Sequence, residues 1–431
     1  MRALALGFKR GYRQRLMAQP TGIHARRAAL KMLDAVMRRG ETLEQAAPAA
    51  LRDVRAPSDQ AFARAMVGEA LRWLTDLDAM IDGATKRPLP DDAKPRAVLR
   101  LMLAQALRLE TPAHAVIATC LPLLSGGPRR LAHGVFSTLM KRGDALPELP
   151  TMPAEVSARW GELSQSIGRG LIDPPEVDLA IKDMSETDHW QARLGGTCHY
   201  EGHVRVPRGT PVEQFDGYSD GAWWVQDLAA MIPAKVLGPG VGHVLDLCAA
   251  PGGKTMALAA AGWKVTALDI SKRRLDVLKA NLKRTGLKAS PVRADALKWE
   301  PKHYFDAILL DAPCTATGTC RRHPDVLHRI GARQIAEMVE IQRELIARAV
   351  GWLKPGGSLV YAVCSLEREE GEEQAAWIDA EFDLAPVPVT AAELPKGIVP
   401  TAEGWVRTHP GMALEKGGLD GFFVARWTKP E

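Results

Sequence analysis

Apolar positions between residues 21 and 146 recur at the three- and four-residue spacing of an amphipathic helix. The pattern predicts helices over residues 25–37, 62–77, 97–109 and 129–142, with prolines separating the runs. We therefore expect an all-helical domain here. Its many arginines are typical of a solvated helix face, and composition alone does not favour a nucleic-acid partner over that simpler interpretation.

After residue 242 the pattern changes to short apolar runs that alternate with helical stretches, as in an open sheet covered by helices on both faces. A helix is predicted over residues 334–353, and its apolar stripe should pack against the sheet. This packing would place the strand that leads to Cys364 beside the strand that ends at Asp311. The predicted strands cover residues 244–248, 264–269, 287–293, 307–310 and 358–364.

Two stretches separate these regions. Prolines at 147, 150, 153, 174 and 175 predict a linker over residues 147–175. In residues 176–225 the apolar runs are short and separated by turns, which favours a small α+β subdomain with antiparallel strands. The strand–helix region would then span residues 226–429.

Length and charge change this picture in one respect. A chain of 431 residues exceeds one ordinary core, and 46% hydrophobic with 25% charged residues is typical of a globular protein. No run of about 18 apolar residues occurs, so no membrane span is expected.

The net charge of +5 is unevenly distributed. Ten Lys/Arg but only one acid precede residue 40, and residues 272–293 are also basic. A basic arm at residues 1–20 favours a polyanionic partner such as RNA, with an organellar transit peptide as the lesser alternative.

Six scattered cysteines without a secretory signal indicate free thiols in a reducing, cytoplasmic setting. Cys314 and Cys320, with His323 and His328, do not match zinc-ligand spacings. We therefore expect no metal.

Polar side chains gather where the predicted strands end. Residues 249–255, Ala-Ala-Pro-Gly-Gly-Lys-Thr, form a turn that opens a helix, and their glycines would let the backbone approach a ligand. The spacing matches neither G-x-G-x-x-G nor the P-loop. Asp269 ends the second strand, where an acid can hold both hydroxyls of a ribose, and Asp295 and Asp311 follow the next two. Together they predict a nucleoside-binding crevice of the Rossmann-like methyltransferase kind.

Cys314 and Cys364 should end neighbouring strands on the ligand side of this sheet. Either cysteine alone would more often be a small core residue. Two thiols could form a redox pair, but the adjacent crevice favours methylation of carbon. A thiolate that adds to carbon 6 of a pyrimidine activates carbon 5 toward a sulfonium methyl donor, and a second cysteine can assist release of the product.

These strings carry a family resemblance. Three strings closely resemble the RNA cytosine-5 methyltransferases of the NOL/NOP/Sun group: Asp246–Thr255, Asp311-Ala-Pro-Cys314 with Gly318 and Arg321-Arg322, and Tyr361-Ala-Val-Cys-Ser365. The terminal residues 420–426 are similar to that group's last hairpin. Residues 21–146, including the string 132–142, resemble the NusB type of RNA-binding helical domain, although the usual Asn of that string is absent. Together the chain resembles the group's bacterial Sun/Fmu branch, which methylates small-subunit (16S) ribosomal RNA.

The resemblance implies a class I methyltransferase sheet and S-adenosyl-L-methionine as cofactor. Asp269 would hold its ribose, Asp295 would lie near the adenine and Asp311 at the methyl end. Asp311 and Lys254 would also hold a flipped cytosine. The turn residues implied to bind the cofactor are Cys248, Ala249, Ala250, Pro251, Gly252, Gly253 and Lys254.

The resemblance also implies that Cys364 is the nucleophile and that Cys314 assists release. Two positions depart from the family pattern: Thr315 replaces a common Ser, and Val363 a usual Thr. These changes bear on rate rather than on reaction type. Residues 176–225 would help to recognise RNA, and Arg321, Arg322 and the stretch 272–293 are hypothetical RNA contacts.

Three further hypotheses remain open. The target could be tRNA or another RNA. A DNA cytosine methyltransferase would use Cys314 as its nucleophile, and a non-catalytic RNA-binding assembly factor would keep a relic cofactor site. We expect a monomer, although no pattern determines the oligomeric state.

Overall fold

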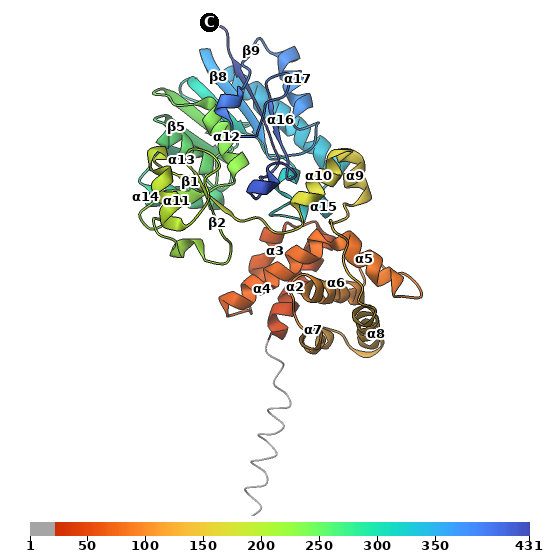
Figure 1. Cartoon of the computed structure of the whole chain (residues 1–431). Helices are drawn as coiled ribbons and strands as arrows, with labels where there is room; N and C mark the ends of the chain where they lie inside the picture. Colours follow the sequence, from red (N-terminus) through yellow and green to blue (C-terminus); the bar gives the residue numbers. More distant parts are fainter. Residues whose placement is uncertain (1–21) are drawn as a thin grey trace, which may run out of the picture. The chain divides into compact units, whose positions relative to one another are not determined.

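The computed structural model describes residues 22–431 (Figure 1). The basic arm predicted for residues 1–20, and with it the transit-peptide alternative, lies outside them. The chain divides into two compact units. One comprises the described residues up to Pro153 together with His323–Arg329, and the other comprises residues 154–322 and 330–431.

The first unit is helical, and α2 contributes its apolar face to the common core. The predicted helix over residues 62–77 is divided at Trp73, and a helix that the sequence analysis missed, α3, contains Pro48 in its interior. A capping box formed by Thr42 and Gln45 gives α3 a defined start. The helices are α2 (Ile23–Arg39), α3 (Leu43–Ala50), α4 (Pro57–Arg72), α5 (Leu74–Gly83), α6 (Lys94–Leu107), α7 (Ala113–Cys120), α8 (Gly126–Arg142) and α15 (Val326–Arg329).

Two arginines of this unit are not the solvated face that the pattern suggested. Arg96 and Arg100 on α6 are each only 2% exposed. Arg100 makes two hydrogen bonds of 2.7 Å to the Asp78 carboxylate, and Arg96 lies 3.1 Å from the same group. Buried guanidinium groups need such partners, so these two side chains hold α5 against α6 rather than facing solvent.

The second unit contains an eight-stranded sheet with the order β10-β11-β8-β7-β4-β5-β6, and β9 pairs with β11. The strands from β8 to β6 run parallel, and β11 is antiparallel to β8. The strands are β4 (His243–Leu247), β5 (Lys264–Asp269), β6 (Ala289–Arg293), β7 (Phe305–Asp311), β8 (Leu353–Val363), β9 (Ala385–Pro386), β10 (Val406–Thr408) and β11 (Phe422–Thr428).

Apolar cores on both faces of the sheet confirm the predicted α/β fold. Helices α12 (Leu228–Leu237), α13 (Gly253–Ala260) and α14 (Lys272–Thr285) contribute to one core, and α16 (Ala332–Trp352) and α17 (Glu372–Glu381) to the other. Because β7 and β8 pair in parallel, with Asp311 opposite Ala362, the predicted neighbourhood of the Asp311 and Cys364 strands is also confirmed.

A small antiparallel sheet precedes the large one, in the order β2-β1-β3. It consists of β1 (Val177–Ile181), β2 (His203–Val206) and β3 (Trp223–Val225), with α11 (Thr187–Leu194) between the first two strands. Antiparallel strands were expected in this stretch.

The predicted linker is not extended, because it contains α9 (Ala154–Trp160) and α10 (Leu163–Gly170). Their apolar side chains Val156, Trp160 and Ile167 are buried, and the Trp160 indole donates to Glu367 at 3.1 Å.

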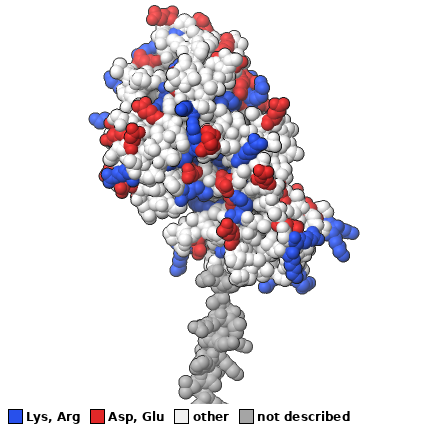
Figure 2. All heavy atoms as spheres, in the orientation of Figure 1, with Lys and Arg blue, Asp and Glu red and all other residues white. Residues whose placement is uncertain are grey.

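All six cysteines are free thiols. Within residues 22–431 no helix is long and apolar enough to cross a membrane. The same residues contain no group of three or more His, Cys, Asp or Glu placed to hold a metal ion. On the face shown in Figure 2, positive and negative side chains are interspersed rather than separated.

Candidate active site

The turn after β4 is shaped by two residues in the left-handed region. Cys248 has φ 66° and Gly252 has φ 107°. A Cβ atom on Gly252 would lie 2.8 Å from Leu278 Cγ, so both conformation and space require glycine there. The turn therefore passes directly over α14 before α13 begins at Gly253.

Asp269, at the end of β5, holds this turn in place. Its carboxylate accepts hydrogen bonds from the backbone N–H of Ala250 at 3.1 Å and of Ser271 at 2.8 Å. The Asp269 side chain is nearly buried, and Arg274 lies 3.5 Å away. A carboxylate has acceptor positions beyond these two bonds, so Asp269 can still bind hydroxyl groups in the cleft.

A cleft of about 600 Å³ lies along the carboxyl ends of the parallel strands. Acids and apolar side chains alternate along it, which suits a nucleoside with a charged or polar tail. Ile270, 64% exposed, and Leu297 offer apolar surface beside the carboxylates. The lining includes Cys248, Asp269, Ile270, Asp295, Leu297, Asp311, Cys314 and Cys364.

The predicted cofactor residues divide between this cleft and a neighbouring hollow. Cys248, Asp269, Asp295 and Asp311 line the cleft. The hollow, of about 320 Å³, is lined by Ala249, Ala250, Pro251, Gly253 and Lys254, and also by Asp311. Gly252 borders neither space.

Cys314 and Cys364 follow β7 and β8, and their Sγ atoms are 3.5 Å apart. The hydrogen bond with Cys364 and the burial of the group raise the pKa of the Cys314 thiol well above its usual value. Cys314 therefore tends to keep its proton.

Lys254, on the first turn of α13, lies 2.8 Å from Asp311. Burial opposes the charged form of Lys254, but the adjacent Asp311 carboxylate outweighs it, and the pKa of the ammonium group is raised. Lys254 also lies 5.1 Å from the centre of the Phe422 ring. Lys254 therefore stays protonated in this ion pair, and its partner Asp311 lines the cleft together with both cysteines.

Sequence reasoning missed Glu370, which is fully buried. Its carboxylate accepts hydrogen bonds from Thr315, Ser365 and Gln342. The acidic run from residue 367 to 373 was visible in the sequence, but nothing in that run distinguishes the buried Glu367 and Glu370 from the exposed Glu369 and Glu373.

The hypothetical RNA contacts have different surroundings. Arg321 is 2% exposed and Arg322 is partly buried, and both pair with Asp227 and Asp420. They belong to the interior of the unit rather than to an RNA-binding face.

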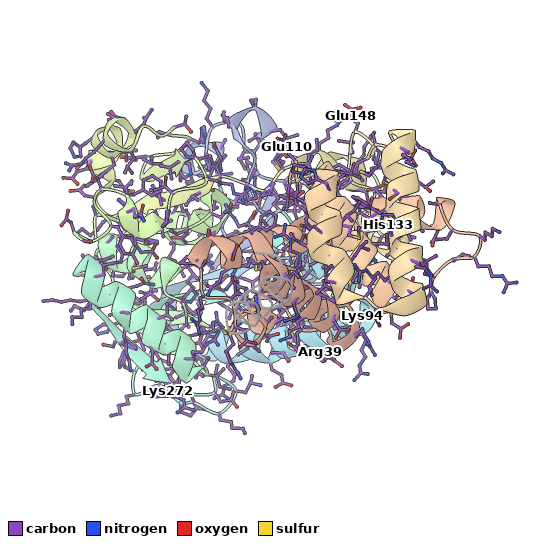
Figure 3. The ribbon with its side chains drawn as sticks, turned by 90° about the horizontal axis from the view of Figure 1, so that it is seen from below. Arg39, Lys94, Glu110, His133, Glu148 and Lys272 are labelled. Atoms are coloured by element: carbon purple, nitrogen blue, oxygen red, sulfur yellow. The ribbon has the colours of Figure 1, made fainter. Side chains whose placement is uncertain are left out.

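By contrast, α14 exposes Arg273, Lys279 and Lys283, and Figure 3 shows Lys272 at its first turn.

The helical unit has a basic hollow of its own, of about 520 Å³. Figure 3 shows Lys94, one of its lining residues, at the start of α6. Its charged lining consists of Arg27, Lys31, Arg38 and Lys94 with Asp34 and Asp92. Positive groups outnumber acids there, as is usual where a protein contacts phosphates.

Comparison with known proteins agrees with this architecture. Residues 236–428 match the family model described as 16S rRNA methyltransferase RsmB/F, and residues 23–125 match the NusB family. The chain is 33% identical to the ribosomal RNA small subunit methyltransferase B of Klebsiella pneumoniae subsp. pneumoniae, over 94% of this chain and 98% of that protein.

Two solved structures share the fold. The crystal structure of PH0851 has a TM-score of 0.71 at 24% identity and covers 94% of this chain and 99% of that one. A methyltransferase homologue from Pyrococcus horikoshii has a TM-score of 0.53 at 25% identity, over 68% of this chain and 98% of that one. With a relative this similar over nearly the whole length of both proteins, the chain belongs to the RsmB branch of the RsmB/F family of 16S rRNA methyltransferases.

Proposed function

We propose that this protein transfers a methyl group from S-adenosyl-L-methionine to carbon 5 of a cytosine in 16S ribosomal RNA. The observation that carries the proposal is the pair of thiols, 3.5 Å apart, that lines a nucleoside-sized cleft. Relatives that align with 94% and 86% of this chain bear the name of a small-subunit rRNA methyltransferase. An rRNA substrate would place the reaction in the cytoplasm.

The residues of the cleft fit the cofactor. Asp269 would hold the ribose hydroxyls, and Asp295 the adenine, with Ile270 and Leu297 covering the rings. Asp311, which lines the cleft together with both cysteines, would lie at the methyl end of the cofactor. The bound cofactor supplies an electrophilic methyl group on its sulfonium sulfur.

The protein's own residues would perform the remaining chemistry. The Cys364 thiolate adds to carbon 6 of the flipped cytosine, and the electrons of the C5–C6 double bond become available at carbon 5. Lys254 and Asp311 hold the base and stabilise the charge that develops at its ring nitrogen. After methylation, the proton on carbon 5 passes to a base such as water, and the C5–H electrons re-form the C5–C6 double bond. The Cys364 sulfur departs with the electrons of the C6–S bond.

Cys314 would assist the departure of the Cys364 sulfur from carbon 6 of the cytosine. Its raised pKa keeps the thiol protonated, and its Sγ lies within hydrogen-bonding distance of Cys364 Sγ. A protonated thiol can donate to the leaving thiolate, which favours breakage of the C6–S bond.

Basic groups support RNA as the substrate. The hollow of the helical unit and the exposed cations of α14 both offer phosphate-binding surface.

The test uses wild type, Cys364→Ala and Cys314→Ala with a 16S rRNA transcript and radiolabelled methyl donor, and scores methyl transfer and covalent protein–RNA adduct together. We expect Cys364→Ala to lose both and Cys314→Ala to accumulate adduct. Normal transfer by Cys364→Ala would overturn the nucleophile assignment, and dependence on Cys314 alone would favour the single-cysteine chemistry of DNA methyltransferases. No transfer by wild type to the transcript or to immature 30S particles would favour the non-catalytic assembly factor.

A further inference from the structure

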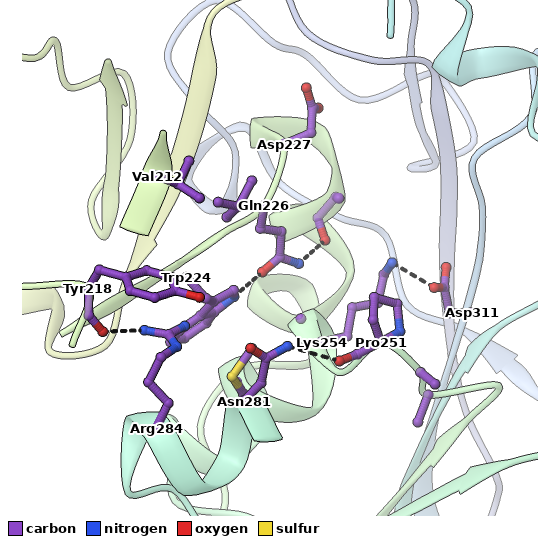
Figure 4. A pocket seen from close by; sticks show the side chains of 16 residues that line it. Val212, Tyr218, Trp224, Gln226, Asp227, Pro251, Lys254, Asn281, Arg284 and Asp311 are labelled. Atoms are coloured by element: carbon purple, nitrogen blue, oxygen red, sulfur yellow. Dashed lines mark hydrogen bonds and ion pairs between the residues drawn. The ribbon is translucent and has the colours of Figure 1, made fainter. Parts of the chain in front are cut away.

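The hollow of about 320 Å³ beside the cofactor cleft has no role in the steps above (Figure 4). It borders the Lys254–Asp311 pair. Asp311 lines both spaces, whereas Cys314 and Cys364 line only the cleft. Its volume is in the lower range of small-ligand sites. Whatever fills it would lie next to a base held by Lys254 and Asp311.

One wall is a preassembled stacking surface. The Arg284 guanidinium carbon lies 4.3 Å from the centre of the Tyr218 ring. Arg284 Nη1 donates to the backbone oxygens of Tyr218 at 2.8 Å and of Trp223 at 3.0 Å, which holds the guanidinium plane in position. Tyrosine rings and arginine planes are the groups on which proteins stack unpaired RNA bases.

The floor carries an oriented amide. Trp224 Nε1 donates to Gln226 Oε1 at 2.7 Å, and Gln226 Nε2 donates to the Ala230 oxygen at 2.9 Å (Figure 4). These two bonds fix which end of the amide is the acceptor. Each end retains one further hydrogen-bonding position, which suits the edge of a base. Asn281, on α14, provides a second amide at the rim.

We propose that this hollow binds the nucleotide adjacent to the target cytosine in the RNA. Its base stacks against the Tyr218–Arg284 wall, and the Gln226 amide contacts its edge. The enzyme thereby selects the cytosine by its neighbour as well as by its own ring. This inference rests on the proposed function, because it requires a cytosine at the Lys254–Asp311 pair.

The test fills the hollow without disturbing the core. Val225 lines it and is 50% exposed, so Val225→Trp adds a side chain into the hollow from its rim. Val241→Trp is the matched control, because Val241 is 90% exposed and does not line the hollow. Thermal unfolding verifies that both variants fold. The wild type is first used to locate the methylated cytosine in the 16S rRNA transcript, and short RNAs around it are then made with an abasic site on either side.

We expect the abasic site on one side to raise the KM for RNA of wild type about 10-fold or more, in line with stacking energies. Val225→Trp should raise the KM for intact RNA about 10-fold, leave the KM for the methyl donor unchanged, and be nearly insensitive to the abasic site. Val241→Trp should match wild type throughout.

Three results would overturn the inference while leaving the proposed function intact. The first is an unchanged KM for RNA in Val225→Trp. The second is a KM that rises in this variant for the methyl donor instead of for RNA. The third is an abasic site that raises the KM for RNA equally in Val225→Trp and in wild type. The second would assign the hollow to the cofactor. Failure of the wild type to methylate any RNA would contradict the proposed function itself, and the inference with it.

Discussion

Thr315, the residue after Cys314, donates its backbone N–H to the Glu370 carboxylate at 2.9 Å. Ser365, the residue after Cys364, donates its hydroxyl to the other oxygen of the same carboxylate. One buried acid therefore holds the residue that follows each cysteine. Burial raises the pKa of Glu370, and the hydrogen bonds from Ser365 and Thr315 oppose that rise. The Sγ–Sγ distance of 3.5 Å is thus maintained by a group outside the cleft.

Glu370→Gln should slow adduct formation. Glutamine keeps the size but turns one acceptor into a donor that faces Thr315 or Ser365, and hydrogen bonds to a charged group contribute about 1.5–3 kcal/mol. We expect the single-turnover rate to fall about 10- to 100-fold, with a lower Tm. Glu369→Gln, on an exposed neighbour, should behave as wild type. A wild-type rate of adduct formation in Glu370→Gln would show that the carboxylate does not position the thiols.

The closeness of the two thiols predicts sensitivity to peroxide. The Sγ atoms must approach from 3.5 Å to about 2 Å to form a disulfide. Oxidation removes two protons and two electrons from the pair and reduces one hydrogen peroxide to two waters.

Peptide mass spectrometry after mild peroxide treatment should therefore find a Cys314–Cys364 cross-link, and dithiothreitol should restore methyl transfer. The buried Cys120 serves as the internal control and should remain a thiol. Recovery of Cys364 as a sulfinic acid, with Cys314 still reduced, would contradict this expectation.

The α/β half of the fold could be predicted because its strands are short, apolar and closed by distinctive turns. Such short apolar runs, each followed by a turn, occur in β4, β5, β7 and β8. Their expected ranges lie within a few residues of the observed ones. The helical half of the fold was harder to predict from the sequence. A proline inside α3 and the division at Trp73 are decided by tertiary packing, which a periodic pattern does not contain.

The site was predictable where chemistry is carried by residues that end strands. Asp269, Asp311, Cys314 and Cys364 could be grouped from sheet topology alone. Arg322, by contrast, was taken as a surface cation, because no sequence pattern shows that acids from β1, the start of α12 and the loop before β11 converge on it. Long-range polar networks of this kind depend on the folded arrangement rather than on spacing.

Arg322→Met should therefore destabilise the protein rather than weaken RNA binding. Arg322 donates to Asp178 at 3.2 Å, Asp227 at 2.6 Å and Asp420 at 3.1 Å. Removing Arg322 takes away one positive charge that these three buried carboxylates share. Breaking a buried ion pair by removing one partner lowers the free energy of unfolding by about 3–5 kcal/mol. For a unit of this size, we expect the Tm to fall by roughly 6–20 °C.

The control for RNA binding is Lys283→Met on the exposed side of α14. It should leave the Tm unchanged and reduce the salt dependence of RNA binding, because it removes one exposed positive charge that is available to an RNA phosphate. Fluorescence anisotropy with the rRNA transcript, well below both melting temperatures, separates the two effects. A large loss of RNA affinity in folded Arg322→Met would return that residue to the RNA-binding surface.

Asp246 predicts an unusual pH dependence of stability. It is fully buried below the glycine turn, and Thr255 donates to its Oδ2 at 2.5 Å, whereas its Oδ1 has no hydrogen-bond partner within the described chain. Burial raises the pKa of Asp246 to about 7, with the Thr255 hydrogen bond opposing. Because the folded-state pKa lies above that of the unfolded chain, the stabilisation is complete below about pH 4 and is lost as the pH rises through about 7. The loss has a ceiling of about 4 kcal/mol.

Asp246→Asn removes the titration but keeps an oxygen that can accept from Thr255, so urea unfolding between pH 5 and 8 should become less dependent on pH than in wild type. Asp306→Asn is the matched control, since the hydrogen bond from Lys354 lowers the pKa of Asp306. The ionised Asp306 carboxylate stabilises the fold above about pH 4. This stabilisation is lost only as the pH falls through the lowered pKa of Asp306, which lies outside the tested range. Asp306→Asn should therefore keep the wild-type slope. A wild-type slope in Asp246→Asn would mean that Asp246 is already ionised in the folded protein at pH 5, and that the turn above it tolerates a buried negative charge.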